Sequence, residues 1–348
     1  MFVDAAEALR QAAERADAFR SIVFMGSIGG GTGSGVGSAL LQHARDIYPA
    51  CYLLPVVVAP SLRSGRGASP LEAYNSLFSL AYLDHFADGV IYTDNDELQG
   101  GTTSRGGFEA MNQRLARDLA SVLLPAPFDS STYLHGHLLP QSPPGVPHLG
   151  SLPRALLAPD VGALVSGACP LPRLKFLELR TSLGSPGSAA STTEAVLAAL
   201  KAAPPRDPRQ RKILTLAVHA VVRGCSPAPP PKQSEGHERR RRNHQRQVMG
   251  SPEDLESHLV KALRPSHAQP VLDLLPGPGG STVPHSCALL LNRTLVPEKI
   301  HHIIRTAAGK FLRRAYVHWY EQHGVTVADF ESAFDAAGEV VRGYAAEG

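Results

Sequence analysis

A glycine-dense stretch between an apolar run and a helical pattern constrains this chain more than any other feature. It covers residues 29–37, follows the apolar residues 22–25 and precedes a helical pattern over residues 39–47. Glycines let backbone N–H groups approach an anion without obstruction by Cβ atoms, and the first helical turn adds free donors and a positive dipole end. A flexible linker is the alternative, but linkers are seldom held between a buried strand and a helix. The stretch therefore predicts a phosphate cradle.

Two common phosphate loops do not fit these residues. A Walker loop ends in a lysine that reaches the terminal phosphates, and no lysine lies between Gly26 and Ala44. The dinucleotide fingerprint G-x-G-x-x-G fails because Val36 occupies its last glycine position. The next apolar strand also ends in Ala59-Pro60, without the carboxylate that binds a ribose. The cradle is therefore specific for a different phosphate ligand.

Residues 29–35 read GGGTGSG, and further motifs follow in order along the chain. They are Glu72-Ala73-Tyr74-Asn75, Thr93-Asp94-Asn95-Asp96, the pair Phe108 and Asn112, and Tyr316-Val317-His318-Trp319-Tyr320. Together they resemble the tubulin superfamily, tightly over residues 21–124 and 286–344 and loosely between. The ending Val340-Val341-Arg342-Gly343-Tyr344 is most similar to the delta type, with the zeta type next. The family's N-terminal strands and loops are missing from the chain.

The resemblance implies that the cradle binds GTP. Mg²⁺ would accompany the nucleotide, although the region of its usual ligand in the family is absent. The residues implied to bind the nucleotide are Ser27, Gly29, Gly30, Gly31, Thr32, Gly33, Ser34, Gly35, Glu72, Asn95, Phe108 and Asn112. Glu72 would lie near the ribose, Asn95 and Asn112 would bond the base, and Phe108 would stack on it. Each has a plainer interpretation: Glu72 as a helix-start acid, Asn95 as a turn residue and Phe108 as a core residue.

Hydrolysis in tubulins is completed by carboxylates from the next subunit, and residues 156–163 correspond to that segment. One acidic residue, Asp160, remains in this segment. It is the one candidate catalytic residue, and it would act on a partner subunit's nucleotide. Ala158 and Ala163 replace an asparagine and a glutamate, and alanine neither accepts a proton nor orients water. We expect at most a weak GTPase and more readily a structural GTP-binding protein. No metal-binding spacing such as HExxH is present.

Alternating strand and helix patterns predict an α/β fold with a doubly wound parallel sheet, whose ligand lies at the carboxyl ends of the strands. Expected helices cover residues 4–20, 70–85, 107–124, 192–202, 298–320 and 327–345, and expected strands cover 22–25, 51–58, 89–92, 174–179 and 213–222. The resemblance implies a tubulin-like organisation with a truncated nucleotide-binding sheet. Its parts are a partial GTP-binding, Rossmann-like domain over 1–128, a linker and loop over 129–153, an intermediate α+β domain over 154–296 and a C-terminal helical hairpin over 297–348.

Composition excludes several other classes of protein. The 348 residues carry a net charge of +3, too little to indicate nucleic-acid binding by itself. We expect no membrane span and no secretion signal, because apolar runs of the required length are absent. Four dispersed cysteines without CxxC spacing fit reduced thiols in the cytoplasm. The low-complexity segment 224–252, with Arg239–Arg242, is a disordered insertion or, alternatively, a basic arm for a polyanion.

These inferences predict a delta-like tubulin, a GTP-binding cytoskeletal protein associated with microtubules, centrioles or basal bodies and cilia or flagella. Its partners would be other tubulins, through longitudinal contacts, and centriolar or ciliary proteins, with neither DNA nor a membrane. The alternative is a nucleotide-independent interaction module that keeps a tubulin-like surface around a degenerate pocket, and the missing N-terminal loops favour it.

Overall fold

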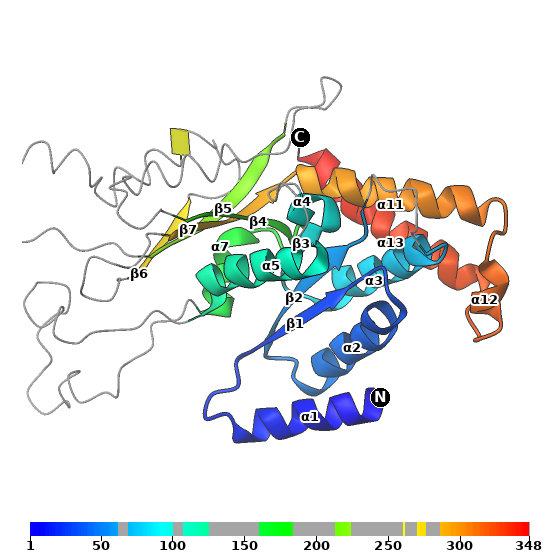
Figure 1. The fold of residues 1–348 in the computed structure, drawn as a ribbon, viewed down its shortest axis with the longest axis horizontal. Helices are drawn as coiled ribbons and strands as arrows, with labels where there is room; N and C mark the ends of the chain where they lie inside the picture. The colour runs from blue at the N-terminus through cyan, green and yellow to red at the C-terminus, as the bar shows by residue number, and fades with distance from the viewer. Residues whose placement is uncertain are drawn as a thin grey trace, which may run out of the picture.

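The computed structural model describes residues 1–61, 69–99, 107–124, 160–183, 213–223, 260–261, 270–275 and 286–347 (Figure 1). Three predictions therefore lie outside the described residues. They are the linker over 129–153, the helix over 192–202 and the insertion over 224–252 with its basic run Arg239–Arg242.

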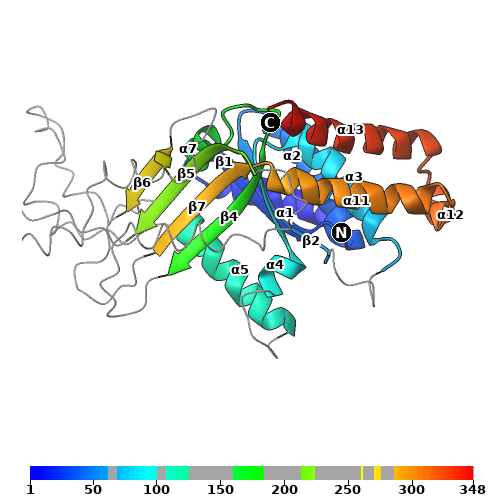
Figure 2. The ribbon, with the colours of Figure 1, turned by 90° about the horizontal axis from the view of Figure 1, so that it is seen from above.

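A seven-stranded sheet organises the described part of the chain (Figure 2). Its strands, in spatial order, are β1 (Ser21–Ser27), β2 (Tyr52–Ala59), β3 (Val90–Asp94), β4 (Phe176–Leu183), β7 (Ser286–Arg293), β5 (Thr215–Arg223) and β6 (Val271–Leu275). Neighbouring strands from β1 to β4 are parallel, whereas β7 is antiparallel to both β4 and β5, and β6 is parallel to β5. The predicted α/β fold is confirmed, with parallel pairing from β1 to β4.

The sheet is continuous between the two segments that the sequence assigns to separate domains. Strand β3 pairs with β4 in parallel, with Val90 opposite Phe176 and Ile91 opposite Leu177. The strands expected in the intermediate domain thus extend the sheet that begins with β1. The boundaries at residues 128 and 154 remain a prediction.

Helices cover both faces of the sheet, as the alternation of buried side chains in β2 requires. Leu53 and Val57 pack into one apolar core, and Leu54 and Val56 pack into the other. The first core contacts α2 (Gly37–Ile47), α3 (Glu72–Phe86), α11 (Leu295–Phe311) and α13 (Val327–Ala346), and the second contacts α5 (Gly107–Leu123) and α7 (Val161–Ala168). Each aliphatic side chain buried in this way stabilises the fold by about 1.5–3 kcal/mol.

The segment after β7 differs from the single helix expected over residues 298–320. It forms α11, which ends at Phe311, and the short α12 (Val317–Glu321). Arg314 and Tyr316 lie between them with φ angles of 50° and 62°, in the left-handed region that a continuous helix excludes. The prediction of one helix is therefore wrong, because apolar periodicity does not reveal this turn.

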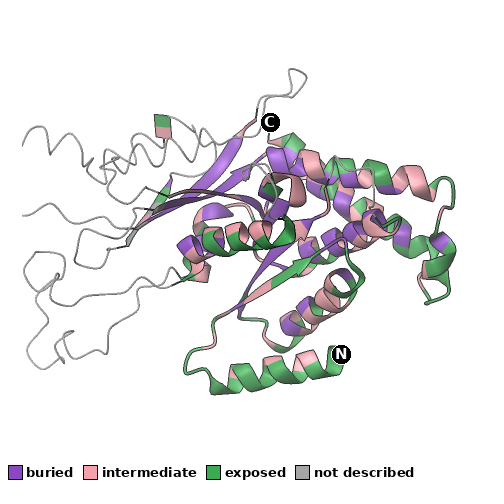
Figure 3. Cartoon of the chain, viewed as in Figure 1, coloured by how far each residue is buried: buried purple, intermediate pink, exposed green. Residues whose placement is uncertain are grey.

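The N-terminal helix α1 (Phe2–Arg15) lies at the surface and packs against α2. None of its residues is buried (Figure 3), although the half-buried Leu9 packs against the first core. The helix expected over 4–20 ends earlier, because Ala16 adopts an extended conformation. Phe19, which lies inside the expected span, packs in the following loop against Tyr48, with ring centroids 4.9 Å apart. Among the described helices, none combines the length and apolar character needed to cross a membrane.

Candidate functional site

The carboxyl ends of three parallel strands meet at one edge of the sheet. Ser27 at the end of β1 lies opposite Val58 of β2, and Ala59 lies opposite Asp94 at the end of β3. The glycine stretch follows β1, and the short helix α4 (Asn95–Gln99) follows β3. The hydroxyl of Ser61, just after β2, donates a hydrogen bond to a carboxylate oxygen of Asp96 in α4. The fold therefore brings the segments of the predicted site to a common edge.

The glycine stretch leaves the sheet as a short bend and enters a π-helical turn, η1 (Thr32–Val36), that continues into α2. The amide of Gly37 donates to the carbonyl of Thr32, and the amide of Ser34 donates to that of Gly30 at 3.0 Å. Turns of the π type are rare and occur often at functional sites. Gly31, at the N-terminal end of this turn, has no side-chain cap, so no capping side chain satisfies the first donors of the helix.

Gly33 is the position at which the bend requires glycine. A Cβ atom there would lie 2.1 Å from the carbonyl oxygen of Ser27, well inside van der Waals contact. Gly30, Gly31 and Gly35 differ, because no described heavy atom lies within 4 Å of the corresponding Cβ positions. The bend is thus tight toward β1 and open on its other side, as a backbone cradle for an anion must be.

The first amides of the bend differ in exposure: Gly29 is buried, whereas Gly30 and Gly31 are exposed. Among the described residues, none accepts a hydrogen bond from the backbone N–H groups of Gly29, Gly30 or Gly31. The carbonyl of Gly29 accepts a bond from Nδ2 of Asn75 in α3, at 3.0 Å. A trans peptide directs its C=O and N–H to opposite sides, so this bond turns the amide of Gly30 away from α3. The arrangement offers donors and a helix N-terminus to negative charge.

The structure places the other predicted residues of the bend as follows. Ser27 ends β1 and is exposed, and Thr32 is exposed in the π turn. Ser34 is buried, and its hydroxyl donates to the carbonyl of Gly31 at 3.4 Å, so its side chain supports the bend. Glu72 begins α3 beside Gly29, since a Cβ at that glycine would lie 3.4 Å from Cγ of Glu72. These residues therefore lie together.

The residues expected to contact the base lie on two neighbouring helices. Asn95 begins α4 and is half-buried. Phe108 and Asn112 lie one turn apart on α5 and are both exposed, Phe108 to 74%. The guanidinium of Arg114 joins the two helices by donating to the carbonyl of Glu97 at 2.7 Å. The interpretation of Phe108 as a core residue is therefore wrong, and its stacking role remains a prediction.

The residues expected to act on a partner subunit lie at α7. Asp160 is exposed at the N-cap position of this helix, and its side chain makes no capping bond. Ala163 is exposed on the same helix, and Ala158 lies outside the described residues. The described residues hold no group of three or more histidine, cysteine, aspartate or glutamate side chains suited to a metal ion.

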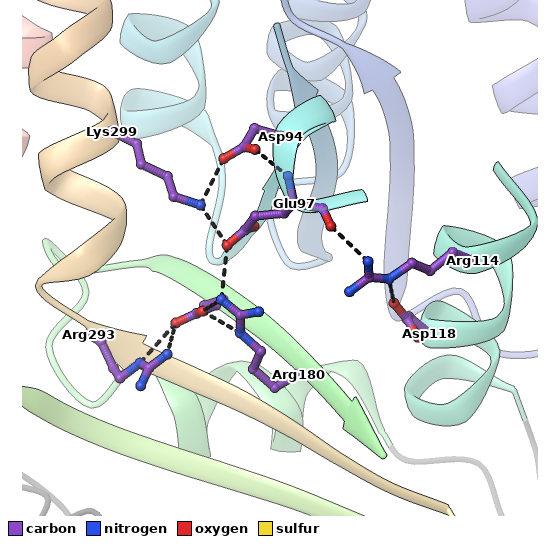
Figure 4. Close-up of polar contacts among 8 residues, drawn as sticks. Asp94, Glu97, Arg114, Asp118, Arg180, Arg293 and Lys299 are labelled. Atoms are coloured by element: carbon purple, nitrogen blue, oxygen red, sulfur yellow. Dashed lines mark hydrogen bonds and ion pairs between the residues drawn. The ribbon is translucent and has the colours of Figure 1, made fainter. Parts of the chain in front are cut away.

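A buried network of charges beneath α4 was not predicted from the sequence (Figure 4). Asp94 caps α4 by accepting from the amide of Glu97 at 2.8 Å. Lys299 of α11 lies 2.8 Å from carboxylate oxygens of both Asp94 and Glu97. Glu97 also pairs with Arg180 of β4 at 2.9 Å. The network holds the end of β3 and the start of α4, where Asn95 lies, against α11 and β4.

The network continues below Arg180 into the sheet. Glu178, 1% exposed, forms ion pairs with Arg180 on its own strand and with Arg293 on β7. Burial alone would raise the pKa of Glu178, but the two adjacent guanidinium groups outweigh it and lower the pKa below its usual value. The sequence gives one local indication of this network: two charged residues, Glu178 and Arg180, alternate with apolar residues in the strand Phe176–Leu183.

A comparison with protein families and a comparison with individual proteins both find similarity to tubulins. Residues 2–102 match the Tubulin/FtsZ family, GTPase domain. Tubulin beta-4 chain of Zea mays and tubulin beta chain of Cicer arietinum are each 25% identical over 346 residues, covering 97% of this chain and 68% of the relative. Tubulin beta-1 chain of Geotrichum candidum is 23% identical over 344 residues, with the same coverage. Residues 2–102 are thus similar to the GTPase domain of the Tubulin/FtsZ family, and the chain as a whole is similar to tubulin beta chains.

Proposed function

We propose that this tubulin homologue is a delta-like tubulin, a GTP-binding cytoskeletal protein that acts with microtubules at centrioles or basal bodies and in assembling cilia or flagella. Two segments of the C-terminal region support the delta type over the zeta type. They are Tyr316-Val317-His318 at the start of α12 and Val340–Tyr344 in α13. The proposed partners are other tubulins, through longitudinal contacts, and centriolar or ciliary proteins.

One observation carries the proposal of nucleotide binding: the open side of the bend presents backbone donors at the carboxyl ends of parallel strands. The amides of Gly29, Gly30 and Gly31 lack acceptors among the described residues, and the bond from Asn75 fixes the peptide between Gly29 and Gly30. Terminal phosphates suit these donors because both charge and hydrogen bonding are satisfied without a lysine. We assign Glu72 to the ribose side, next to Gly29.

We assign the base to α4 and α5. Asn95 and Asn112 would read its polar edge, and Phe108 would cover its face. Phe108 is 74% exposed, so its ring is accessible to the face of a base. Mg²⁺ bound with GTP would take its ligands mainly from phosphate oxygens and water, since the described residues hold no carboxylate cluster for it.

The nucleotide would act at an interface between subunits and undergo little turnover. Asp160 alone remains as an acid on α7, and the exposed Ala163 has no group that could accept a proton or orient water for a partner's nucleotide. The proposal therefore predicts GTP binding without measurable steady hydrolysis by the isolated chain.

The test uses two glycine variants with opposite expectations. Binding of GTP to the full chain is measured by equilibrium dialysis for the wild type, Gly33→Ala and Gly37→Ala. The first variant places a methyl group against the carbonyl of Ser27 and distorts the bend, so GTP binding should fall by at least about tenfold. Gly37→Ala adds a methyl in open space at the start of α2 and should keep wild-type affinity. Circular dichroism checks that both variants fold.

The alternative function is a nucleotide-independent interaction module. The unpaired edge of the described sheet at β1 favours it. Among the described strands, β1 has one neighbour, β2, and Met25 on β1 is 68% exposed, which is unusual in a parallel sheet. This alternative predicts binding to purified tubulin that is equal with and without GTP. Saturable binding of GTP at micromolar concentration, abolished by Gly33→Ala, would exclude it.

A further inference from the structure

A hydrogen-bonded path runs from the glycine bend to the far tip of the molecule. Asn75 donates from Nδ2 to the carbonyl of Gly29 at 3.0 Å, and its Oδ1 accepts from the hydroxyl of Tyr320 at 2.6 Å. Tyr320 belongs to α12, which lies at the end of the molecule opposite β6 (Figures 1 and 2). Residues 245 positions apart in the chain are therefore joined through a single amide side chain.

The direction of these bonds is fixed by chemistry. A carbonyl oxygen only accepts, so the side of Asn75 that faces Gly29 must be its NH₂ group. The oxygen of Asn75 then faces Tyr320, whose hydroxyl must donate. Burial raises the pKa of Tyr320 to about 12, so the hydroxyl keeps its proton at neutral pH. Tyr320 thus holds Asn75 in the one orientation that can bond the bend.

Tyr320 is itself held firmly in place. Its ring packs edge-on against Tyr74 and Phe330, with centroids 5.6 and 5.5 Å away. The hydroxyl of Tyr74 donates to the carbonyl of Ala315, in the left-handed turn before α12, at 2.9 Å. Lys310, at the end of α11, donates to the carbonyl of Pro70 just before α3 at 2.6 Å. These two hydrogen bonds join the tip of the molecule to the start of α3.

We infer that Tyr320 is a positioning residue for the phosphate cradle: through Asn75 it fixes the peptide that presents the amide of Gly30, and it thereby couples the cradle to the surface of α12. This inference rests on the proposed nucleotide binding and adds how the site is controlled. Trp319, the neighbour of Tyr320, is 55% exposed on that surface. A change in the position of Tyr320 therefore changes the affinity for GTP, and bound GTP in turn favours one position of Tyr320.

The chain contains a single tryptophan, Trp319, which makes the coupling measurable without a label. Tyr320→Phe removes one hydroxyl and keeps the ring packing. Tyr316→Phe, an exposed tyrosine of the same turn, is the matched control. Dialysis gives the affinity of each full-length variant for GTP, the fluorescence of Trp319 is recorded with and without GTP, and thermal unfolding checks folding.

We expect Tyr320→Phe to weaken GTP binding about threefold to tenfold, the effect of one hydrogen bond, and Tyr316→Phe to leave it unchanged. GTP should alter the emission of Trp319 in the wild type and not in Tyr320→Phe. Adding Tyr320→Phe to Asn75→Ala should weaken binding no further than Asn75→Ala alone, because both act through one path.

Two other outcomes are decisive and distinguishable. If the wild type binds GTP and Tyr320→Phe binds it equally well with the same change in Trp319 emission, the coupling is refuted and the nucleotide site stands. If the wild type does not bind GTP at all, the proposed function fails and the inference fails with it.

Discussion

At the scale of single residues, Glu178 is a charged side chain buried inside the sheet, so its charge must be balanced by neighbouring side chains. It is 1% exposed, and its charge is balanced by Arg180 and Arg293 on two neighbouring strands. Without this carboxylate, Arg293 would lose its ion pair among the described residues, and Arg180 would keep Glu97 as a partner, in a medium of low dielectric constant. We therefore expect the stability of the network to depend on Glu178 more than on its half-buried members Glu97 and Lys299.

The first prediction is that Glu178→Gln destabilises the chain by about 3 kcal/mol or more, the usual effect of removing one partner from a buried ion pair. Urea unfolding followed by circular dichroism measures the change. Glu331→Gln, at an exposed position on α13, is the control and should have no measurable effect. Equal stability of the two variants would show that the network contributes little.

The second prediction concerns how the stabilising effect of Glu178 changes with pH. The pKa of Glu178 is lower in the folded chain than its ordinary value of 4.5, so the ionised form stabilises the fold above that value. This contribution disappears as the pH falls through the lowered pKa of the folded state. The stability difference between the wild type and Glu178→Gln should therefore narrow as the pH falls below 4.5. A difference that stays constant with pH contradicts the assignment.

At the scale of single elements, α13 has the clearest local start signal. Thr326 accepts a bond from the amide of Asp329, and the carboxylate of Asp329 accepts from the amide of Thr326, which forms a capping box. We predict that Thr326→Ala costs about 1 kcal/mol of stability in urea unfolding. Thr306→Ala, at an exposed position inside α11, lacks a capping role and should change stability little. Similar losses in both variants would exclude the cap as the cause.

The sequence predicts elements well where the signal is local. Alternating or continuous apolar residues mark β2 and β3, and helical periodicity marks α3, α5 and α13, because those patterns depend on the immediate neighbours of each residue. Strands β6 and β7 were not predicted. The position of β7 between β4 and β5 depends on pairing with residues that lie 63 to 115 positions earlier in the chain, which local periodicity does not encode.

In the candidate site, too, the sequence predicts features formed by adjacent residues and misses contacts between distant ones. The glycine bend was recognisable because its residue types are adjacent in the chain, and the need for glycine at Gly33 has a local cause in Ser27. The contact between Asn75 and Gly29 and the ion pairs of Lys299 arise from folding, across 46 residues in the first case. Neither has a sequence pattern of its own. The nucleotide-binding roles of Glu72, Asn95, Phe108 and Asn112 remain predictions.

At the scale of the whole molecule, the C-terminal helix is joined to the centre of the sheet at one point. The hydroxyl of Tyr344 in α13 accepts from the amide of Phe176 at 3.0 Å and donates to Oδ1 of Asn292 at 2.9 Å. Asn292 in turn donates to the carbonyls of Ala168 and Leu174. A helix, two strands and the end of α7 therefore share one buried set of hydrogen bonds.

This connection predicts that the C-terminal helices unfold together with the sheet. Tyr344→Phe keeps the ring but leaves the amide of Phe176 and the oxygen of Asn292 unpaired in the core, so it should cost about 1–3 kcal/mol. Tyr82→Phe, at a 37% exposed position on α3, is the control. Urea unfolding followed by Trp319 fluorescence reports the C-terminal region, and hydrogen exchange reports β4. If α13 is integral to the fold, both probes shift by the same amount in Tyr344→Phe. An earlier transition in the fluorescence alone would mean that the helices form a unit separable from the sheet.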